Sequence, residues 1–289
     1  MREKIKTGLS IFIILILLPY VAVVFRTGNM RGQEPEISEN RLEDYVAGIL
    51  PGQMQISYQE EALKAQAVII RTNLLKKGME FYHTDNLKEA ASAIQETDLK
   101  AMGFTYTSPE DLEELWKYEQ WKEYETKLWD AVNATEGQIL TIEGLPVELP
   151  YHAVSAGRTR NGRILGEEYS FLEPVDCPQD VEAADYMDIQ FLELPAVPEI
   201  SARDEAGYVT ELLMEEESLT GEEFRSRFAL NSSNFILDET DKGIRAVTKG
   251  LGHGLGLSMY QSNRFAAEGK TYLEILHYFY KNVECISFN

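Results

Sequence analysis

Three segments of this chain combine residue types that can do chemistry, and the first runs from Glu61 to Thr72. At helical spacing Glu61 shares a face with small or apolar residues, among them Ala65 and Val68. A carboxylate partly removed from water holds its proton more tightly, which suits a general acid. A glutamate in the exposed first turn of a helix is also common, because the helix dipole favours negative charge there. Both interpretations of Glu61 stay open at this point.

The second segment is a polar loop that follows a predicted strand end. It contains four candidate ligand-binding residues: His152, Ser155, Gly157 and Thr159. Loops of small hydroxyl residues beside a sheet often present hydrogen bonds to ligands. They are also ordinary turns, since the same residue types favour turn conformations.

The third segment opens a predicted helix with four glycines on alternate positions, from Gly250 to Gly256, and contributes three more candidates: His253, Ser258 and Tyr260. Alternating glycines let the backbone approach a ligand or a neighbouring strand closely. A phosphate loop would need a Gly-Lys-Ser/Thr ending, which is absent. A serine hydrolase built on Ser258 departs from the Gly-x-Ser-x-Gly pattern at Tyr260. For His253, a packed and hydrogen-bonded structural role is the alternative.

Metal and cofactor signals are missing from the sequence. The four histidines and two cysteines show no zinc-ligand spacing, so we expect neither a metal nor a cofactor. Cys177 and Cys285 are too few to build a disulfide scaffold. They can pair with each other or remain as buried thiols, and the sequence does not decide between these.

Helices are predicted to hold the first segment. Apolar spacing predicts a helix from Leu42 that Pro51-Gly52 stops. A second helix begins after Ser57, and its apolar stripe is followed by Gly78 in the manner of a C-cap. That stripe consists of Leu63, Ala67, Ile70 and Leu74. A third, long helix begins at Ser108-Pro109 and runs to Gly137.

Strand-like patterns follow. From Gln138 to Ile142 the apolar period is that of a strand, Glu143-Gly144 predicts a turn, and Val147 to Val154 predicts the next strand. Another sheet region is predicted over Phe235 to Val247. The chain returns to helix over two closing segments, Ser258 to Gly269 and Tyr272 to Tyr280. This mixture predicts an α+β fold, a single globular domain of helices packed on antiparallel sheet.

The N-terminus predicts a membrane anchor. Met1 to Thr7 carries three basic residues, and Gly8 to Phe25 has no charge. About 18 apolar residues at about 1.5 Å each nearly span a bilayer core, and the basic flank favours a cytoplasmic N-terminus. We therefore expect one transmembrane helix within residues 1–26, a linker over 27–40 and an extracytoplasmic domain over 41–289. A cleaved signal peptide is the alternative.

Overall charge excludes one class of partner. The 289 residues include 27 Lys and Arg against 48 Asp and Glu, a formal net charge of -21. A surface this acidic repels phosphate backbones, so DNA and RNA are not expected partners.

Three ordered motifs resemble the stage II sporulation protein D family and its amidase-enhancer relatives. They are the Glu-Ala-Leu-Lys-Ala-Gln-Ala run from Glu61 with the Arg-Thr pair that closes at Thr72, the Ser-x-Gly-x-Thr loop at Ser155 to Thr159, and the Gly-His-Gly-x-Gly-x-Ser run at Gly252 to Ser258. The resemblance extends over roughly Arg41 to Cys285.

The resemblance implies a peptidoglycan lytic transglycosylase that cuts glycan strands stripped of their peptides during spore engulfment. Carried over to this chain, Glu61 is the general acid and base, and the candidates in the two later motifs hold the sugars. One carboxyl group suffices for this reaction because the sugar's own 6-hydroxyl closes an anhydro ring. The implied location is the mother-cell membrane, with the domain facing the intermembrane space. The implied partners are glycan strands, other cell-wall hydrolases and engulfment membrane proteins.

The chain also departs from the family pattern. Members usually read Glu-Met-Pro where this chain has Gln53-Met54-Gln55, and Met259 and Gln261 replace the usual Gln and Gly of the last motif. The cysteine of a zinc-holding member has no counterpart in Ala101 to Thr105. An alternative from another class is therefore a non-catalytic wall-binding or amidase-activating module with the same fold.

Overall fold

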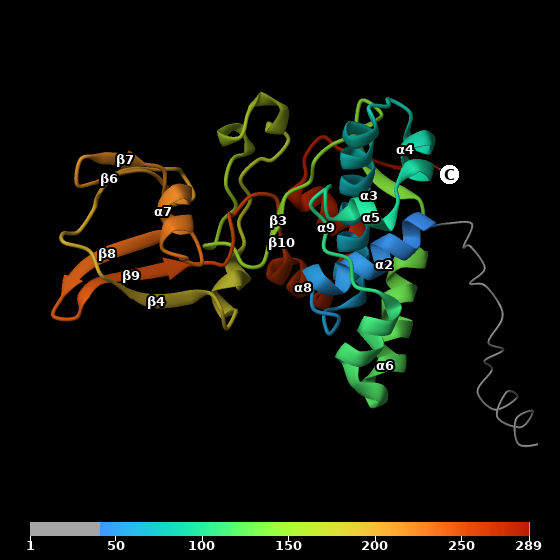
Figure 1. Cartoon of the computed structure of the whole chain (residues 1–289), viewed down its shortest axis with the longest axis horizontal. Helices are drawn as coiled ribbons and strands as arrows, with labels where there is room; N and C mark the ends of the chain where they lie inside the picture. Colours follow the sequence, from blue (N-terminus) through green and yellow to red (C-terminus); the bar gives the residue numbers. More distant parts are fainter. Residues whose placement is uncertain (1–40, 289) are drawn as a thin grey trace, which may run out of the picture. The chain divides into compact units, whose positions relative to one another are not determined.

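Helix α3 (Glu60–Tyr82) is the element against which α4, α6, α8, α9 and the first sheet pack (Figure 1). The computed structural model describes residues 41–288, and from Leu42 onward the described chain forms one unit. The predicted stripe is confirmed, since all four of its residues are fully buried in one apolar cluster: Leu63, Ala67, Ile70 and Leu74. The opposite face of α3 is buried too, with Ala65, Val68 and Ile69 in a second cluster.

The first cluster joins α3 to the N-terminal helices. These are α2 (Arg41–Gln53), α4 (Leu87–Ala93), α5 (Glu96–Leu99) and α6 (Pro109–Ala134). The predicted start of α6 is confirmed, because the Ser108 side chain accepts the backbone N–H of Asp111 at 3.2 Å. Its end lies at Ala134, three residues before the predicted Gly137.

Two predicted helix ends are wrong. Helix α2 continues through Pro51 to Gln53. A proline in the last turn removes only one backbone hydrogen bond, and the turn is kept because the Met54 N–H still donates to the Leu50 carbonyl. Helix α3 continues past Gly78, and His83 closes it in the left-handed conformation with a φ of 54°. Gly78 serves close packing instead. A Cβ at this position would lie 3.0 Å from the Ile94 side chain at the end of α4.

The first sheet has the order β11-β1-β2. Its strands are β1 (Gln138–Ile142), β2 (Leu145–Pro146) and β11 (Glu284–Ser287), all antiparallel. The predicted turn is confirmed, since Glu143 and Gly144 both have positive φ, as a two-residue hairpin of matching twist requires. The strand predicted from Val147 to Val154 is too long, since only β3 (Tyr151–His152) forms within this range. Its partner β10 (Leu257–Ser258) is equally short and runs parallel to it, which limits the paired length.

The closing helices α8 (Met259–Ala267) and α9 (Tyr272–Phe279) confirm the predicted C-terminal pair, and each ends a residue or two earlier than predicted. They pack on α3 through the second cluster, which includes Phe265, Ile275 and Phe279. Three short 3-10 helices cover the loops between β3 and β4: Gly162–Ile164, Glu167–Tyr169 and Pro178–Glu182.

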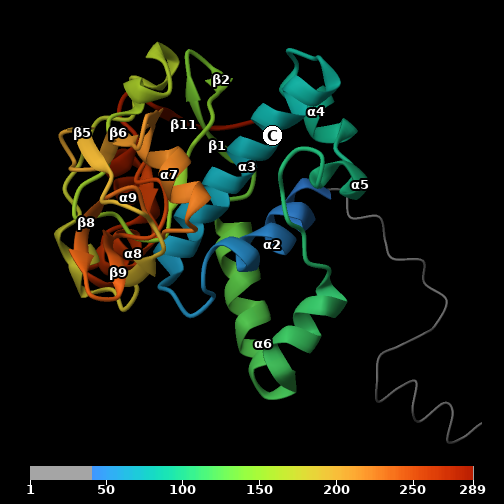
Figure 2. The ribbon, with the colours of Figure 1, turned by 60° about the vertical axis from the view of Figure 1, so that its left-hand side comes forward.

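The residues from 187 to 249, here called the strand subdomain, form two further three-stranded sheets, of which β5, β6, β8 and β9 are labelled in Figure 2. These elements share an apolar cluster of their own. One sheet has the order β4-β9-β8 and contains the predicted region from Phe235 to Val247; the other has the order β5-β6-β7. The elements are β4 (Met187–Leu192), β5 (Glu199–Arg203), β6 (Val209–Met214), β7 (Glu217–Leu219), α7 (Gly221–Arg227), β8 (Phe235–Thr240) and β9 (Gly243–Lys249).

The predicted α+β class is confirmed by these helices and antiparallel sheets. The predicted membrane helix falls outside the described residues. Between residues 41 and 288, no helix combines the length and the apolar character needed to cross a bilayer.

A buried ion pair ties α2, α3, α6 and β1 together. The Arg71 Nε donates to Glu43 Oε1 at 2.8 Å, and Arg71 Nη2 donates to the other carboxylate oxygen. Arg71 is fully buried and Glu43 is 4% exposed. Both side chains also form hydrogen bonds with backbone groups. The Gly137 N–H donates to Glu43 at 3.2 Å, and Arg71 donates to the Gln138 carbonyl at 3.1 Å. A buried ion pair is tolerated when its other donors and acceptors are satisfied in this way.

Replacing Arg71 with methionine should lower the free energy of unfolding by about 3–5 kcal/mol, because the Glu43 carboxylate stays buried without its counterion. Urea unfolding followed by circular dichroism measures this loss. Arg163→Met is the control, since Arg163 pairs with Glu167 at the surface and should cost less than about 1 kcal/mol. Equal losses in the two variants would contradict the structural role of Arg71.

Candidate functional site

Glu61 lies in the first turn of α3, and each of its carboxylate oxygens accepts a hydrogen bond from another group of the protein. Its Oε2 accepts the backbone N–H of Tyr272, the first residue of α9, at 2.7 Å. Its Oε1 accepts from Lys64 Nζ at 2.8 Å, and Lys64 also pairs with Glu60. The Glu61 side chain is 30% exposed. The carboxylate therefore supplies an acceptor to one of the free N–H groups at the start of α9.

The two serines of the later motifs meet at a buried carboxylate that the sequence did not point to. Asp180 accepts the Ser155 backbone N–H at 2.7 Å and the Ser258 hydroxyl at 2.9 Å. Ser258 also accepts the Gln261 N–H as the N-cap of α8. All three residues are fully buried, and burial raises the pKa of Asp180 to about 6. The serines thus hold the loop and α8 together.

The rest of the Ser-x-Gly-x-Thr loop is also tied to backbone. The Thr159 hydroxyl accepts the Val175 N–H at 2.9 Å, and Thr159 is 1% exposed. The Gly157 N–H donates to the Ser155 hydroxyl at 3.1 Å. Tyr260, at the start of α8, donates its backbone N–H to the Ala153 carbonyl and keeps a partly exposed side chain. Ser155 and Thr159 therefore shape the loop from inside.

The alternating glycines face neighbouring strands and side chains of the protein. A Cβ at Gly254 would lie 2.4 Å from the Tyr208 hydroxyl of the strand subdomain, and one at Gly256 would lie 1.8 Å from the Pro150 carbonyl. Both glycines have positive φ. Of the two explanations that the sequence left open, close approach to neighbouring backbone is the one seen here.

Two histidines lie side by side at the centre of this region, with ring centroids 5.8 Å apart. His152 is 3% exposed, and its Nδ1 lies 3.0 Å from the Leu255 carbonyl. A carbonyl can only accept, so we assign the ring proton to Nδ1, which leaves Nε2 without a partner among the described residues. Burial, followed by the neighbouring His253, lowers the pKa of His152 to about 3. His152 is therefore a neutral ring.

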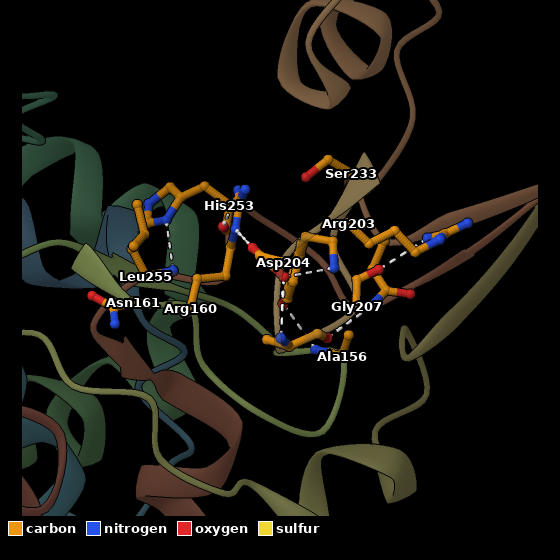
Figure 3. A network of polar contacts seen from close by, with 12 residues as sticks. Ala156, Arg160, Asn161, Arg203, Asp204, Gly207, Ser233, His253 and Leu255 are labelled. Atoms are coloured by element: carbon orange, nitrogen blue, oxygen red, sulfur yellow. Dashed lines mark hydrogen bonds and ion pairs between the residues drawn. The ribbon is translucent and has the colours of Figure 1, made fainter. Parts of the chain in front are cut away.

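His253 is held in a similar way. Its Nδ1 accepts the Leu255 N–H at 3.1 Å, as Figure 3 shows. Burial is the largest cause that lowers its pKa. His253 is partly exposed, and its lowered pKa favours the neutral ring.

Two clefts meet at His253. The helix-side cleft has a volume of about 560 Å³ and is lined by residues that include Gln53, Asn73, Lys77, Glu148, Tyr151 and His253. The strand-side cleft has a volume of about 590 Å³ and is lined by residues that include Arg160, Leu165, Val209, Glu222, His253 and Leu255. Pro150 and His253 line both clefts, so the two clefts adjoin at these residues, and together they are here called the groove.

The charges that line this groove are paired. Arg160 Nε donates to Asp204 at 2.6 Å and Arg160 Nη1 donates to Glu222 at 2.9 Å, which joins the loop after Thr159 to the strand subdomain (Figure 3). Arg160 also lies over the Tyr208 ring at 4.8 Å and donates to the His253 carbonyl at 3.3 Å. In the helix-side cleft Lys77 pairs with Glu148 at 3.2 Å.

Among the predicted site residues, His253 is the one that lines the two clefts. Glu61, His152, Ser155, Gly157, Thr159, Ser258 and Tyr260 line neither cleft. Gln53, which the sequence analysis identifies as a departure from the family pattern, lines the helix-side cleft and accepts a hydrogen bond from Gln66 Nε2 at 3.0 Å. Sequence reasoning noted Gln53 as a departure, but it missed the placement, which depends on α2 extending through Pro51.

Cys177 and Cys285 are free thiols, which settles the alternatives that the sequence left open. Within residues 41–288, no group of three or more His, Cys, Asp or Glu side chains is arranged to hold a metal ion.

The chain is similar to known proteins whose names refer to sporulation. A family model described as Stage II sporulation protein matches residues 30–142. Stage II sporulation protein D of Bacillus subtilis is 28% identical over 92% of this chain and 79% of its own length, and that of Bacillus amyloliquefaciens is 27% identical over 92% and 78%. The predicted resemblance is confirmed: the chain is a relative of stage II sporulation protein D.

The pH dependence of stability should report the neutral burial of His152. Its pKa is about 3 in the folded protein and about 6.5 when unfolded, so the unfolded chain takes up the proton first as pH falls. Stability should then fall by up to about 1.4 kcal/mol per pH unit below about pH 6.5. Asp180 acts in the opposite sense in this range, because its pKa is raised to about 6.

A comparison of the wild type with His152→Asn removes the contribution of Asp180, which is the same in both proteins. Asparagine keeps a donor for the Leu255 carbonyl but cannot titrate. In urea unfolding the advantage of the wild type should shrink steadily from pH 7 to pH 4. A constant difference over this range would contradict the burial of a neutral His152.

Proposed function

We propose that this chain is a sporulation protein that binds peptidoglycan glycan strands in the groove formed by the two clefts. The observation that carries the proposal is that both clefts share Pro150 and His253, so that they lie next to each other along the protein surface. A linear polymer needs a groove that is open along its length, and two adjoining clefts of about 560 and 590 Å³ accommodate successive sugars.

The basic side chains that line the groove are paired within the protein. Its lysine and its arginine are each ion-paired, and the His253 ring is neutral because burial lowers its pKa. Two partly exposed rings, Tyr151 and His253, line the helix-side cleft. Sugars combine apolar ring faces with hydroxyl groups, which match such a lining.

The lining supports binding more than it supports cleavage. Two carboxylates, Glu148 and Glu222, line the described clefts, and each is ion-paired to a basic side chain. Gln53 stands where relatives usually have glutamate, and an amide cannot transfer a proton. On this basis the non-catalytic alternative, a wall-binding module, is the function that we favour.

Lytic transglycosylase activity through Glu61 is the second candidate. Its support is the match of Glu61 to the family motif and the fixed position of the carboxylate, which is 30% exposed and held by Tyr272 and Lys64. In this hypothesis Glu61 would protonate the glycosidic oxygen and then remove the proton of the 6-hydroxyl.

The predicted placement remains part of this proposal: an N-terminal anchor in the mother-cell membrane with residues 41–289 outside, near other cell-wall hydrolases. Protease added to intact protoplasts is the measurement that tests this placement. A domain that survives until the membrane is lysed would overturn it.

Filling the helix-side cleft should abolish glycan binding. Gln53→Trp places an indole in a cleft that sugars would occupy, and we expect at least a tenfold loss of binding, or about 1.4 kcal/mol. Co-sedimentation with purified glycan strands measures it. Gln55→Trp is the matched control, because Gln55 is exposed, lies two residues away and lines neither cleft. Unchanged binding by Gln53→Trp would remove the groove proposal.

Mass spectrometry of the bound strands separates the two candidate functions. We expect that the wild-type chain leaves denuded strands intact, without anhydro-sugar ends. If anhydro ends appear, Glu61→Gln should lower their rate of formation by about 10²–10⁴-fold and Glu60→Gln should leave it unchanged. That outcome would replace the binding function with the lytic transglycosylase.

A further inference from the structure

Strand β4 forms one edge of the sheet β4-β9-β8, at the outer margin of the strand subdomain in Figure 1. It pairs with β9 in an unbroken antiparallel register from Met187 to Leu192. Next to this ladder, the Gly250 N–H donates to the Tyr186 carbonyl at 2.7 Å. Because hydrogen-bonded pairs alternate in an antiparallel ladder, the backbone groups of every second residue from Tyr186 face β9. Those of the residues in between face away from the sheet: Met187, Ile189 and Phe191.

These three residues leave both their backbone and their side chains open to a partner. In the part of the chain that the structure describes, their N–H and C=O groups form no hydrogen bond. Their side chains are apolar and are 53%, 53% and 50% exposed. Ile189 on β4 and Ile236 on β8 both pair with Val247, so these side chains lie on one face of the sheet. An edge of this kind is a template for pairing with a further strand.

The other edge strands of the strand subdomain carry features that oppose such pairing. The register of β5 shifts at Ala202, and β7 has only three residues. On β8 the Phe235 carbonyl accepts a hydrogen bond from Arg203 Nη2 at 2.8 Å. Bulges, short strands and covered edges are the usual protection against an added strand. Strand β4 has no bulge, no proline and no lysine, so its edge lacks this protection.

Charge at the two ends of β4 decides between the possible occupants of this edge. Exposed Asp185 precedes the strand, and exposed Glu193 follows it. Antiparallel pairing with β4 of a second copy, with Ile189 opposite itself, would place Asp185 beside Glu193 at both ends, and each copy carries a net charge of -21. Lys249 on β9 and Lys242 in the β8–β9 turn lie on the side of β4 away from the open edge. A strand with basic residues at both ends matches the edge.

We propose that β4 is a docking edge for an extended segment of another protein, which adds a strand to the sheet β4-β9-β8. The segment has apolar side chains on alternate residues and a lysine or arginine at each end. Its backbone pairs with the outward groups of β4, and its basic ends lie beside Asp185 and Glu193. Neither these two residues nor any residue of β4 lines either cleft, so the interface does not depend on the proposed glycan binding.

A fluorescent peptide, Lys-Val-Thr-Val-Thr-Val-Lys with blocked ends, tests the edge on the full chain in detergent. Fluorescence anisotropy should show saturable binding with a dissociation constant below about 1 mM. Two matched peptides separate the parts of the proposal. Glutamate in place of both lysines should weaken binding at least about fivefold, because like charges then meet at both ends. Methylation of the backbone amides should weaken it at least about tenfold, because the peptide then has no N–H to donate.

Variants of Ile189 locate the binding on β4. Ile189→Pro removes an outward N–H and no bond to β9, and an edge strand accepts proline at such a position. Ile189→Lys keeps this N–H and places a cation beside the added strand. Each should weaken binding of the lysine-ended peptide at least about tenfold. Ile236→Lys is the matched control, because Ile236 is 51% exposed on the same face, two strands from the edge, and it should leave binding unchanged.

Thermal unfolding checks that the variants fold, and the half-exposed position of Ile189 predicts that they do. Binding that persists in both Ile189 variants would overturn the docking edge. An equal loss in Ile236→Lys would overturn it too, because the whole sheet face would then be the site.

The partner chemistry is tested separately. Equal affinity for the lysine-ended and glutamate-ended peptides would overturn the basic partner, and no binding of the lysine-ended peptide at about 1 mM would overturn the proposal as a whole. Sedimentation velocity in the same detergent tests the second copy. A wild-type dimer that Ile189→Lys converts to a monomer would assign the edge to self-association instead.

Discussion

The structure depends on one buried ion pair, between Glu43 and Arg71. Two charges with 4% and no exposure are stable only if each is neutralised and hydrogen-bonded, and here the partners come from α2 and α3. The remaining bonds fix the end of α6 and the start of β1 through Gly137 and Gln138. The pair thereby fixes the direction of α2, whose last residue, Gln53, lines the helix-side cleft.

The same constraint explains the composition of the first motif. Arg71 and the two residues after it all bond to backbone outside α3: Thr72 accepts the Leu140 N–H, and Asn73 exchanges two hydrogen bonds with Leu149. At the other end of the motif Glu61 accepts the first N–H of α9. Through these hydrogen bonds α3 holds a sheet, a loop and a second helix. The bonds explain why the motif has glutamate, arginine and threonine at these positions, and the explanation does not involve a substrate.

How much the sequence predicts depends on how local each signal is. The apolar stripe of α3 and the Ser108 cap are periodic or adjacent patterns, and both were predicted correctly. Pro51 and Gly78 predict helix ends, but both helices continue beyond these residues, because the packing of distant residues outweighs local tendencies. Asp180 could not be found from the sequence, because its partners lie 25 and 78 residues away and no pattern near it distinguishes it from the other acidic residues.

The placement of the groove follows from the strand subdomain, which the sequence predicted only over its last two strands. Arg160 follows the second motif directly, and its charge is neutralised from the subdomain, by Asp204 on the β5–β6 loop and Glu222 on α7. The same guanidinium donates to the His253 carbonyl, so the subdomain, the second motif and the third motif share one residue. Without Asp204 and Glu222, Arg160 would place an unpaired cation beside His253, and the cleft would attract anions. The strand subdomain, through Asp204 and Glu222, therefore pairs the Arg160 charge that lines the groove, in a chain whose net charge is -21.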